Sequence, residues 1–253
     1  MRLKDLLQSI NNIANNIHTS PPWICGGTPR DKVMGKLSNI ADLDLTTGDN
    51  TVHYLAKELA VLLGRHYSFD QKNMPDGHIS IHLGNLKIDF SSNFIAPDID
   101  NLLKSQGISA PTPIQREMFS RDFTCNALLM KLDLKTVLDP TNKGISDIHA
   151  KTIRTCLDPA ITMTTNKNRV VRAIYLAAKL DFNLDPALSK WIKANPQYIK
   201  TLSTEHSLKE KLNKAIEYNP TKTAQLLTEL GLWQHIPITE ALQPLYNQTH
   251  IVE

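Results

Sequence analysis

Two aspartates separated by one residue, Asp42 and Asp44, are the side chains whose spacing first points to chemistry. Residues 41–46 alternate between apolar and polar types, so a β-strand here would carry both carboxylates on one face. No Lys or Arg in the neighbouring sequence pairs with them, and their charges would repel unless a cation lay between them. Hard divalent cations such as Mg²⁺ bind carboxylate oxygens and keep sites for water and substrate phosphates. We therefore predict that Asp42 and Asp44 are metal ligands.

A glycine-rich turn upstream has the residues of a phosphate-binding site. Trp23–Cys25 is a short apolar run, typical of a buried strand, and Gly26 and Gly27 close it. Thr28 and the proline after it indicate a helix that has Thr28 as its N-cap. The glycines would let the backbone approach a ligand, the helix end would direct amide groups at an anion, and Arg30 adds a positive charge. A phosphate-binding turn followed by a metal-binding aspartate pair predicts phosphoryl or nucleotidyl transfer.

These residues resemble a known family. The patterns Gly-Gly-x-x-Arg-Asp at 26–31 and Asp-x-Asp-x-x-Thr at 42–47 resemble the head-domain signature of class II nucleotidyltransferases, which comprise tRNA CCA-adding enzymes and bacterial poly(A) polymerases. Residues 121–127 resemble the second motif of that family, Arg-Arg-Asp-Phe-Thr-x-Asn-Ala, although Ser120 stands where the first Arg is usual. Residues 169–182 resemble the neck helix of the family. The alternative is a glycine-rich turn beside a solvent-exposed acidic strand.

The resemblance, which covers roughly residues 20–182, implies a fold of the α+β class. It predicts a nucleotidyltransferase head with a small mixed β-sheet at 1–148, followed by an all-helical neck and abbreviated body at 149–253. The second part is the candidate for RNA binding, because residues 151–253 contain 13 Lys or Arg against 9 Asp or Glu, whereas residues 1–150 contain 15 against 16. So mild an excess of positive charge is also common in proteins that bind no nucleic acid.

The resemblance also implies the reaction, a transfer of a nucleoside monophosphate from an NTP to the 3′-hydroxyl of an RNA with release of pyrophosphate. Asp42 and Asp44 would hold two Mg²⁺ ions. Asp89, in the expected strand 86–90, would be a third catalytic carboxylate that favours deprotonation of the primer hydroxyl. An ordinary aspartate at a strand end is the alternative for that residue. ATP and CTP are the expected substrates, and the 3′ end of a tRNA is the expected primer.

Several residues are predicted to bind the nucleotide. Arg121 can neutralise triphosphate charge, Asp122 can accept a hydrogen bond from a ribose hydroxyl, and Asn126 can brace the site. A capped helix that begins at Ser120 is the alternative reading of this segment, and both can hold together. The full set of predicted nucleotide-binding residues is Gly26, Gly27, Arg30, Arg121, Asp122, Asn126, Asn166, Arg169 and Arg172.

The largest departure from the family lies before the neck helix. In CCA-adding members a Glu-Asp pair precedes the first neck Arg, and the Asp and the Arg read the base of the incoming nucleotide. This chain has Thr165 and Asn166 at those positions, while Arg169 and Arg172 lie on neighbouring positions of one helix face. The Asn166 amide can both donate and accept. We therefore expect looser or differently biased base selection, and an Arg169 that is freer to move without its acidic partner.

Composition excludes some classes of protein. No apolar run approaches the roughly 20 residues of a membrane helix, and residues 1–17 have the spacing of a docking helix, unlike a signal peptide. The widely spaced Cys25, Cys125 and Cys156 fit neither disulfides nor zinc, which favours reduced packing residues and a cytoplasmic location. The rival functions are a CCA-like enzyme retargeted to another RNA and a degenerate, non-catalytic member that binds RNA or nucleotides. The oligomeric state stays open.

Further elements follow from periodicity and turn residues. A helix is predicted at 50–63, ended by Gly64, and a short helix at 98–106 within a largely irregular segment. Strands are predicted at 66–69, 79–83 and 86–90, with an Asp76–Gly77 turn before the second of them. The predicted helices after residue 183 carry lysines that either line an RNA-facing side or form ordinary solvated surface; these are Lys209, Lys211, Lys214 and Lys222.

Overall fold

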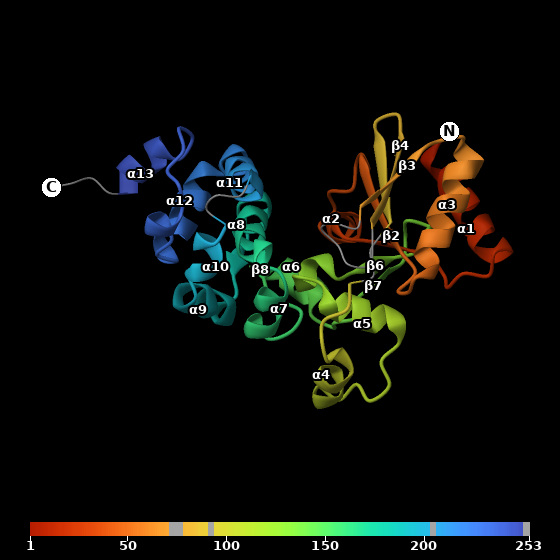
Figure 1. The fold of residues 1–253 in the computed structure, drawn as a ribbon, viewed down its shortest axis with the longest axis horizontal. Helices are drawn as coiled ribbons and strands as arrows, with labels where there is room; N and C mark the ends of the chain where they lie inside the picture. The colour runs from red at the N-terminus through yellow and green to blue at the C-terminus, as the bar shows by residue number, and fades with distance from the viewer. Residues whose placement is uncertain (71–77, 91–93, 203–205, 250–253) are drawn as a thin grey trace. The chain divides into compact units, whose positions relative to one another are not determined.

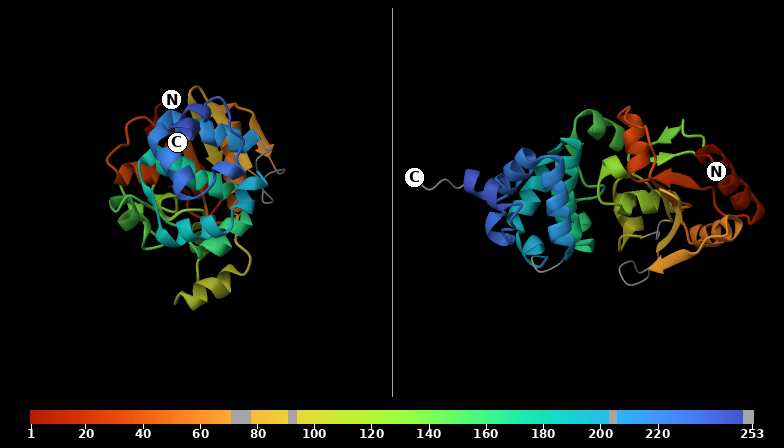
Figure 2. Two further views of the ribbon diagram at one scale, coloured as in Figure 1. Left: turned by 90° about the vertical axis from the view of Figure 1, so that its left-hand side faces the viewer. Right: turned by 90° about the horizontal axis from the view of Figure 1, so that it is seen from above.

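The computed structural model describes residues 1–70, 78–90, 94–202 and 206–249 (Figure 1). The chain divides into two compact units, Met1–Ile148 and His149–Glu253. The first unit is built around a β-sheet, whereas the second is mainly helical (Figures 1 and 2). The chain therefore has the α+β composition that the sequence predicts.

A mixed sheet of seven strands, counted over the described residues, forms the centre of the first unit. The strands lie in the order β3-β4-β5-β2-β1-β6-β7, and every neighbouring pair is antiparallel except β2 and β5, which are parallel. Their bounds are β1 (Trp23–Cys25), β2 (Asp42–Thr46), β3 (Tyr67–Asp70), β4 (His78–Leu83), β5 (Leu86–Phe90), β6 (Leu129–Met130) and β7 (Val137–Leu138). The predicted mixed sheet is confirmed, while the predicted Asp76–Gly77 turn lies outside the described residues.

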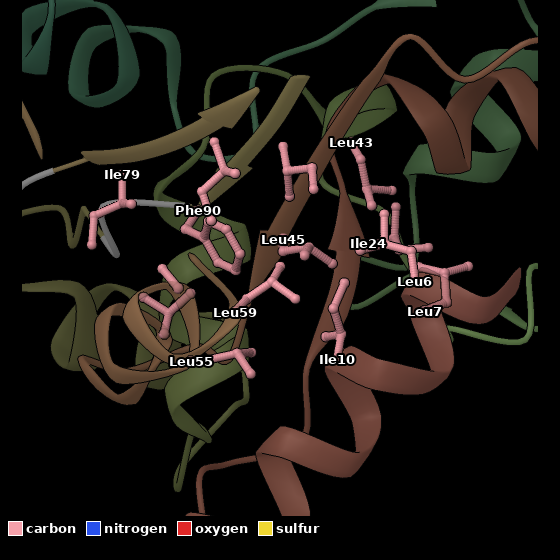
Figure 3. Packing of buried hydrophobic residues seen from close by; sticks show 14 of the residues in the cluster. Leu6, Leu7, Ile10, Ile24, Leu43, Leu45, Leu55, Leu59, Ile79 and Phe90 are labelled. Atoms are coloured by element: carbon pink, nitrogen blue, oxygen red, sulfur yellow. The ribbon is translucent and has the colours of Figure 1, made fainter. Parts of the chain in front are cut away.

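One face of this sheet packs against two amphipathic helices, α1 (Leu3–Asn16) and α3 (Thr51–Leu63). Figure 3 shows side chains of both helices directed at those of the central strands. In β2 the alternation places Leu43 and Leu45 in this core with no exposed surface. Asp42 and Asp44, at the alternate positions of the strand, therefore face the other way. The apolar face of the sheet thus determines which face is left for polar side chains.

Two helices predicted in the first unit are confirmed, α3 and a short helix in the irregular segment. Gly64 has a φ of 58° and forms the left-handed C-cap of α3. Helix α4 (Ile99–Ser105) confirms the short helix in the otherwise irregular segment. Helix α5 (Pro113–Ser120) begins with a capping box between Thr112 and Gln115. The helix α6 (Gly144–His149) lies at the end of this unit.

The alternative reading of Ser120 as the N-cap of a helix is wrong. Ser120 is the last residue of α5, and only the short 3₁₀ helix η1 (Thr124–Asn126) follows it. Its hydroxyl donates to the Arg116 carbonyl at 2.7 Å and accepts from the Ala96 amide at 2.8 Å. A serine hydroxyl can bond to many backbone groups, so sequence alone did not distinguish this use from capping.

The second unit is a set of short helices joined to one small parallel ladder. Helices α8, α11 and α12 pack against one another (Figure 1), and the ladder pairs β8 with β9. The elements are β8 (Thr152–Ile153), α7 (Pro159–Thr165), α8 (Asn168–Leu180), β9 (Asn183–Leu184), α9 (Pro186–Ala194), α10 (Gln197–Lys200), α11 (His206–Tyr218), α12 (Pro220–Glu229), η2 (Trp233–His235) and α13 (Gln243–Thr249). No helix in the described part of the chain is long and apolar enough to cross a membrane.

We expect Leu45→Ala to destabilise the first unit by about 2–5 kcal/mol, because it removes a side chain that has 0% of its surface exposed in the core. The free energy of unfolding from urea titration would measure the change. Val61→Ala is the matched control: Val61 is 77% exposed on α3, and its loss should cost no more than about 0.5 kcal/mol. Equal costs for the two substitutions would contradict the assignment of this face as the core.

Candidate active site

Three carboxylates share the face of the sheet opposite the core. In the parallel pairing of β2 with β5, Asp44 lies directly across from Asp89, while Leu43 pairs with Ile88 on the core side. Asp42 precedes Asp44 by two residues and therefore lies on the same face of β2. The structure brings together the three acidic residues predicted from the sequence, and their catalytic roles remain predictions.

Asp44 lies in an environment that opposes its charge. Burial raises the pKa of Asp44, and the neighbouring Asp89 and Asp42 raise it further, against the opposing effect of Arg121 and Lys87. A cation bound to the carboxylate would relieve both the burial and the repulsion. The charged form of this group is therefore favoured by a positively charged ligand.

The donor set of Asp42 and Asp44 fits a hard divalent cation, which accepts carboxylate oxygens. Within the described residues, no group of three or more His, Cys, Asp or Glu side chains could hold a metal ion, so a site here would have two protein carboxylates. Such a site suits Mg²⁺, which is usually bound by one or two carboxylates together with water and substrate phosphates. Asp42 and Asp44 would be its protein ligands.

Asp89 is held by three neighbouring side chains. Ser80 Oγ donates to Asp89 Oδ1 at 2.5 Å, Lys87 Nζ to Oδ2 at 2.5 Å, and His78 Nε2 lies 3.3 Å from Oδ1. Burial raises the pKa of Asp89, but the hydrogen bonds from His78, Lys87 and Ser80 outweigh it and leave the pKa well below its usual range. The charged form of the Asp89 carboxylate is thus favoured. Its role in deprotonating a primer hydroxyl stays a prediction.

The glycine turn touches the aspartate pair directly. Gly26 has a φ of 72°, and a Cβ built there would lie 2.3 Å from Asp44 Oδ2, so this position requires glycine. Helix α2 (Gly27–Val33) begins after Gly26, and the prediction of Thr28 as its N-cap is wrong. The hydroxyl of Thr28 instead donates to the Asp42 carbonyl at 3.3 Å, which ties the turn to β2.

Arg30 lies beneath this turn and is only 4% exposed. Its Nη1 donates to Asn126 Oδ1 at 2.7 Å, and its Nε donates to Asp31 Oδ1 at 2.9 Å. A Cβ at Gly27 would lie 3.2 Å from Arg30 Nη2, so the guanidinium packs against the turn itself. Asn126 thus holds the guanidinium that packs against the turn, while its predicted part in nucleotide binding stays a prediction.

Arg121 extends from the end of α5 toward β1 and β2. Its Nη2 donates to Glu117 Oε1 at 2.8 Å and contacts Cys25 Sγ at 3.0 Å. Burial raises the pKa of the Cys25 thiol to about 12, despite the positive charge of Arg121, so the thiol stays neutral. The guanidinium side chain is 20% exposed and near enough to Asp44 to lower its pKa.

Glu117 is a component of the site that the sequence did not reveal. It is 2% exposed, pairs with Arg121, and accepts a hydrogen bond from the Thr46 hydroxyl of β2. A glutamate four residues before an arginine on a helix indicates an ion pair. That spacing could have identified the pair, but its burial against β2 depends on tertiary packing.

Asp122 is buried beside this network. It is 7% exposed, and its Oδ1 accepts a hydrogen bond from the Phe123 amide at 2.9 Å, which orients the carboxylate.

The three cysteines of the chain are free and buried. This agrees with the packing role predicted for Cys25, Cys125 and Cys156.

Asn166, Arg169 and Arg172 belong to the second unit. Asn166 Oδ1 accepts from the Asn168 amide at 2.9 Å, at the start of α8. Arg169 Nη1 donates to the Thr162 carbonyl at 2.9 Å and to Thr165 Oγ1 at 2.8 Å. Arg169 therefore has two uncharged acceptors in α7, and the expectation that it is freer to move than with an acidic partner stays a prediction.

Comparison with known proteins agrees with this geometry. Residues 22–154, more than half of the chain, match the family described as the poly(A) polymerase head domain. The matched range contains the glycine turn, the three carboxylates and Arg121. The chain belongs to the class II nucleotidyltransferase family. This membership confirms the resemblance stated from the motifs.

Relatives of this class II nucleotidyltransferase include enzymes named for tRNA. It is 26% identical over 246 residues to the tRNA nucleotidyltransferase cca1 of Schizosaccharomyces pombe, covering 91% of this chain and 49% of that protein. It is 25% identical over 217 residues to the CCA-adding enzyme of Levilactobacillus brevis, covering 85% and 51%. The chain thus spans about half the length of these curated relatives.

The fold of this class II nucleotidyltransferase is also that of solved structures. The CCA-adding enzyme of Bacillus stearothermophilus, solved in complex with CTP, superposes with a TM-score of 0.72 at 19% identity, covering 97% of this chain and 57% of that one. At this identity the likeness shows the fold alone. It confirms the predicted head fold followed by helices.

We expect Gly26→Ala to destabilise the protein largely by displacing Asp44. Gly35 is the control, because it also has a positive φ, of 69°, but a Cβ there would have nothing within 4 Å. Urea titration should show a loss of about 1–2 kcal/mol for Gly35→Ala and a larger loss for Gly26→Ala.

A double-mutant cycle would identify the cause of the larger loss. In an Asp44→Ala background, Gly26→Ala should cost less than in wild type, and Gly35→Ala should cost the same. An unchanged cost of Gly26→Ala in both backgrounds would mean that the turn and Asp44 are not coupled.

Proposed function

We propose that this chain catalyses Mg²⁺-dependent transfer of a nucleoside monophosphate from ATP or CTP to the 3′-hydroxyl of an RNA, with a tRNA 3′ end as the primer. The observation that carries the proposal is the meeting of Asp42, Asp44 and Asp89 on one sheet face, next to the Gly26 turn and Arg121. The names of the relatives, which are tRNA nucleotidyltransferases and CCA-adding enzymes, support the same class of substrate.

The residues of the first unit would have different roles in the proposed reaction, according to the chemistry of their side chains. Asp42 and Asp44 would hold Mg²⁺, which when bound activates the attacking hydroxyl and stabilises the leaving oxygens. Asp89 stays ionised because three side chains donate to it, and it adds negative charge to that face. The turn at Gly26 has no side chain to block a phosphate. Arg121 supplies positive charge to the triphosphate, and Asp122 accepts from a ribose hydroxyl.

Base selection in this chain would differ from the carboxylate-based reading of CCA-adding members. The Asn166 carbonyl already accepts from the Asn168 amide, which leaves it one further acceptor position beside the NH₂ donor. Arg169 is oriented by Thr162 and Thr165 in place of an acidic residue. Uncharged partners bind an arginine less strongly than a carboxylate does. We therefore propose selection that is looser than that of a strict CCA-adding enzyme.

Substitution of the aspartate pair tests the reaction. Asp42→Ala and Asp44→Asn should each lower incorporation of labelled ATP or CTP into tRNA lacking its 3′ end by at least about 100-fold, because each removes a metal ligand. Glu58→Gln, which alters an exposed carboxylate on α3, should leave the rate unchanged. Activity within tenfold of wild type in both aspartate variants would contradict the metal site. Wild-type binding of nucleotide and RNA without any incorporation would instead favour the non-catalytic alternative.

Restoring acidic residues before α8 tests base selection. Thr165→Glu with Asn166→Asp should raise the preference for CTP and ATP over UTP and GTP, because Asp at 166 can still accept from the Asn168 amide and Glu at 165 can pair with Arg169. Thr164→Glu, at an exposed neighbouring position, is the control for added charge. Incorporation of each labelled NTP would be measured separately. An unchanged profile in the double variant would remove residues 165–169 from base selection.

A further inference from the structure

A second concave surface of the first unit includes none of the three carboxylates. This groove of about 740 Å³ lies between α1, the residues that lead into β1, and the turn that joins β6 to β7. Its volume is within the range of roughly 300–1,000 Å³ that is usual for ligand sites. The residues that matter below are Lys4, Gln8 and Asn11 of α1, Trp23 of β1, and Lys131 and Lys135 of the turn.

The ionic side chains of this groove are mainly positive. Lys4, Lys131 and Lys135 line it, and Asp133 is the one acidic residue in its lining as described. Asp133 Oδ1 accepts hydrogen bonds from the Lys135 and Thr136 amides at 2.8 and 3.1 Å, and these bonds hold the pKa of Asp133 below its usual value. The Asp133 carboxylate is therefore hydrogen-bonded to backbone amides of its own turn. The three ammonium groups lie in a unit where acidic residues slightly outnumber basic ones.

The turn that carries two of these lysines is well defined. The Lys131 amide donates to the Thr136 carbonyl at 2.9 Å, and the Leu134 amide donates to the Lys131 carbonyl at 3.0 Å. Leu132 and Leu134 pack against the hydrophobic core of the sheet and α1. Lys131 and Lys135 are thus held on a fixed backbone, which lowers the entropy lost when a ligand binds.

The remaining lining matches the other parts of a nucleotide. Trp23 is half-buried and lines the groove together with Pro21 and Pro22. Aromatic faces stack with any nucleobase, and amide side chains such as those of Gln8 and Asn11 can bond to base edges. An acidic peptide would use the lysines but would leave the indole and the amides without matching groups. The lining as a whole fits phosphates and bases together.

We propose that this groove binds a single-stranded segment of RNA, with phosphates at Lys4, Lys131 and Lys135 and a base stacked on Trp23. The proposal rests on the proposed function for the identity of the ligand, since an enzyme that extends RNA must hold RNA. It goes beyond that function because the groove has no part in the metal site. The groove would supply a second RNA-binding surface, separate from the site that holds the reacting 3′-hydroxyl.

Fluorescence anisotropy with a labelled single-stranded RNA hexamer would test the groove in the full chain. Lys131→Gln with Lys135→Gln should weaken binding about tenfold or more at low salt. The slope of log affinity against log salt should become shallower by about 1.4, since each phosphate contact on a single strand contributes about 0.7. Lys104→Gln with Lys143→Gln, two exposed lysines of the same unit outside the groove, should change neither quantity.

Photo-crosslinking of 5-iodouridine RNA, read by mass spectrometry, would locate the ligand, and the expected crosslink is in the peptide that contains Trp23. An unchanged affinity and salt slope in the groove variant, or crosslinks confined to other peptides, would overturn the proposal. An acidic peptide that binds the groove and is not displaced by RNA would overturn it as well. Lysine-dependent RNA binding in a chain that incorporates no nucleotide would support the groove while refuting the proposed reaction, so the two failures are distinguishable.

Discussion

Repulsion between carboxylates on one sheet face is the physical constraint on which the first unit depends. Asp44 and Asp89 face each other across β2 and β5, and burial makes the charge of Asp44 still less favourable. Each therefore has a cationic neighbour, Lys87 for Asp89 and Arg121 for Asp44. The opposite face can be wholly apolar only because the alternation of β2 sends every acidic side chain to this one. Burial of the core and concentration of charge are consequences of the same strand period.

The cations are in turn fixed by a further layer of polar groups. Glu117 holds Arg121 and connects it to Thr46, while Asn126 holds Arg30 below the glycine turn. Positive and negative groups thus alternate outward from the sheet, so the positive charge near the aspartates is already partly balanced. A triphosphate would add several negative charges to this arrangement. For the proposed reaction, this balance would favour a nucleotide that arrives with its own divalent cations, as nucleoside triphosphates do in the presence of Mg²⁺.

Local patterns predicted what depends on neighbours in the chain, and tertiary contacts decided the rest. The strand period was enough to place Asp42 and Asp44 on one face, and Gly64 was enough to end α3. The burial of Glu117 could not be predicted, because it depends on the packing of α5 against β2. Thr28 and Ser120 were misassigned as N-caps because their hydroxyls bond to backbone groups elsewhere. The two acceptors of Arg169, a carbonyl and a hydroxyl of α7, could not be predicted because neutral acceptors leave no charge pattern in the sequence.

The single parallel pairing in the sheet has a consequence for how the protein folds. Strands β2 and β5 are neighbours in space, but α3, β3 and β4 lie between them in the chain, whereas β4 and β5 are joined by a short turn. Closing so long a connection costs chain entropy before its contacts can repay it. Asp44 and Asp89 therefore come together only when this non-local step is complete. A nascent or partly folded chain would have its local helices and hairpins without the assembled site, so the carboxylate cluster would form late in folding.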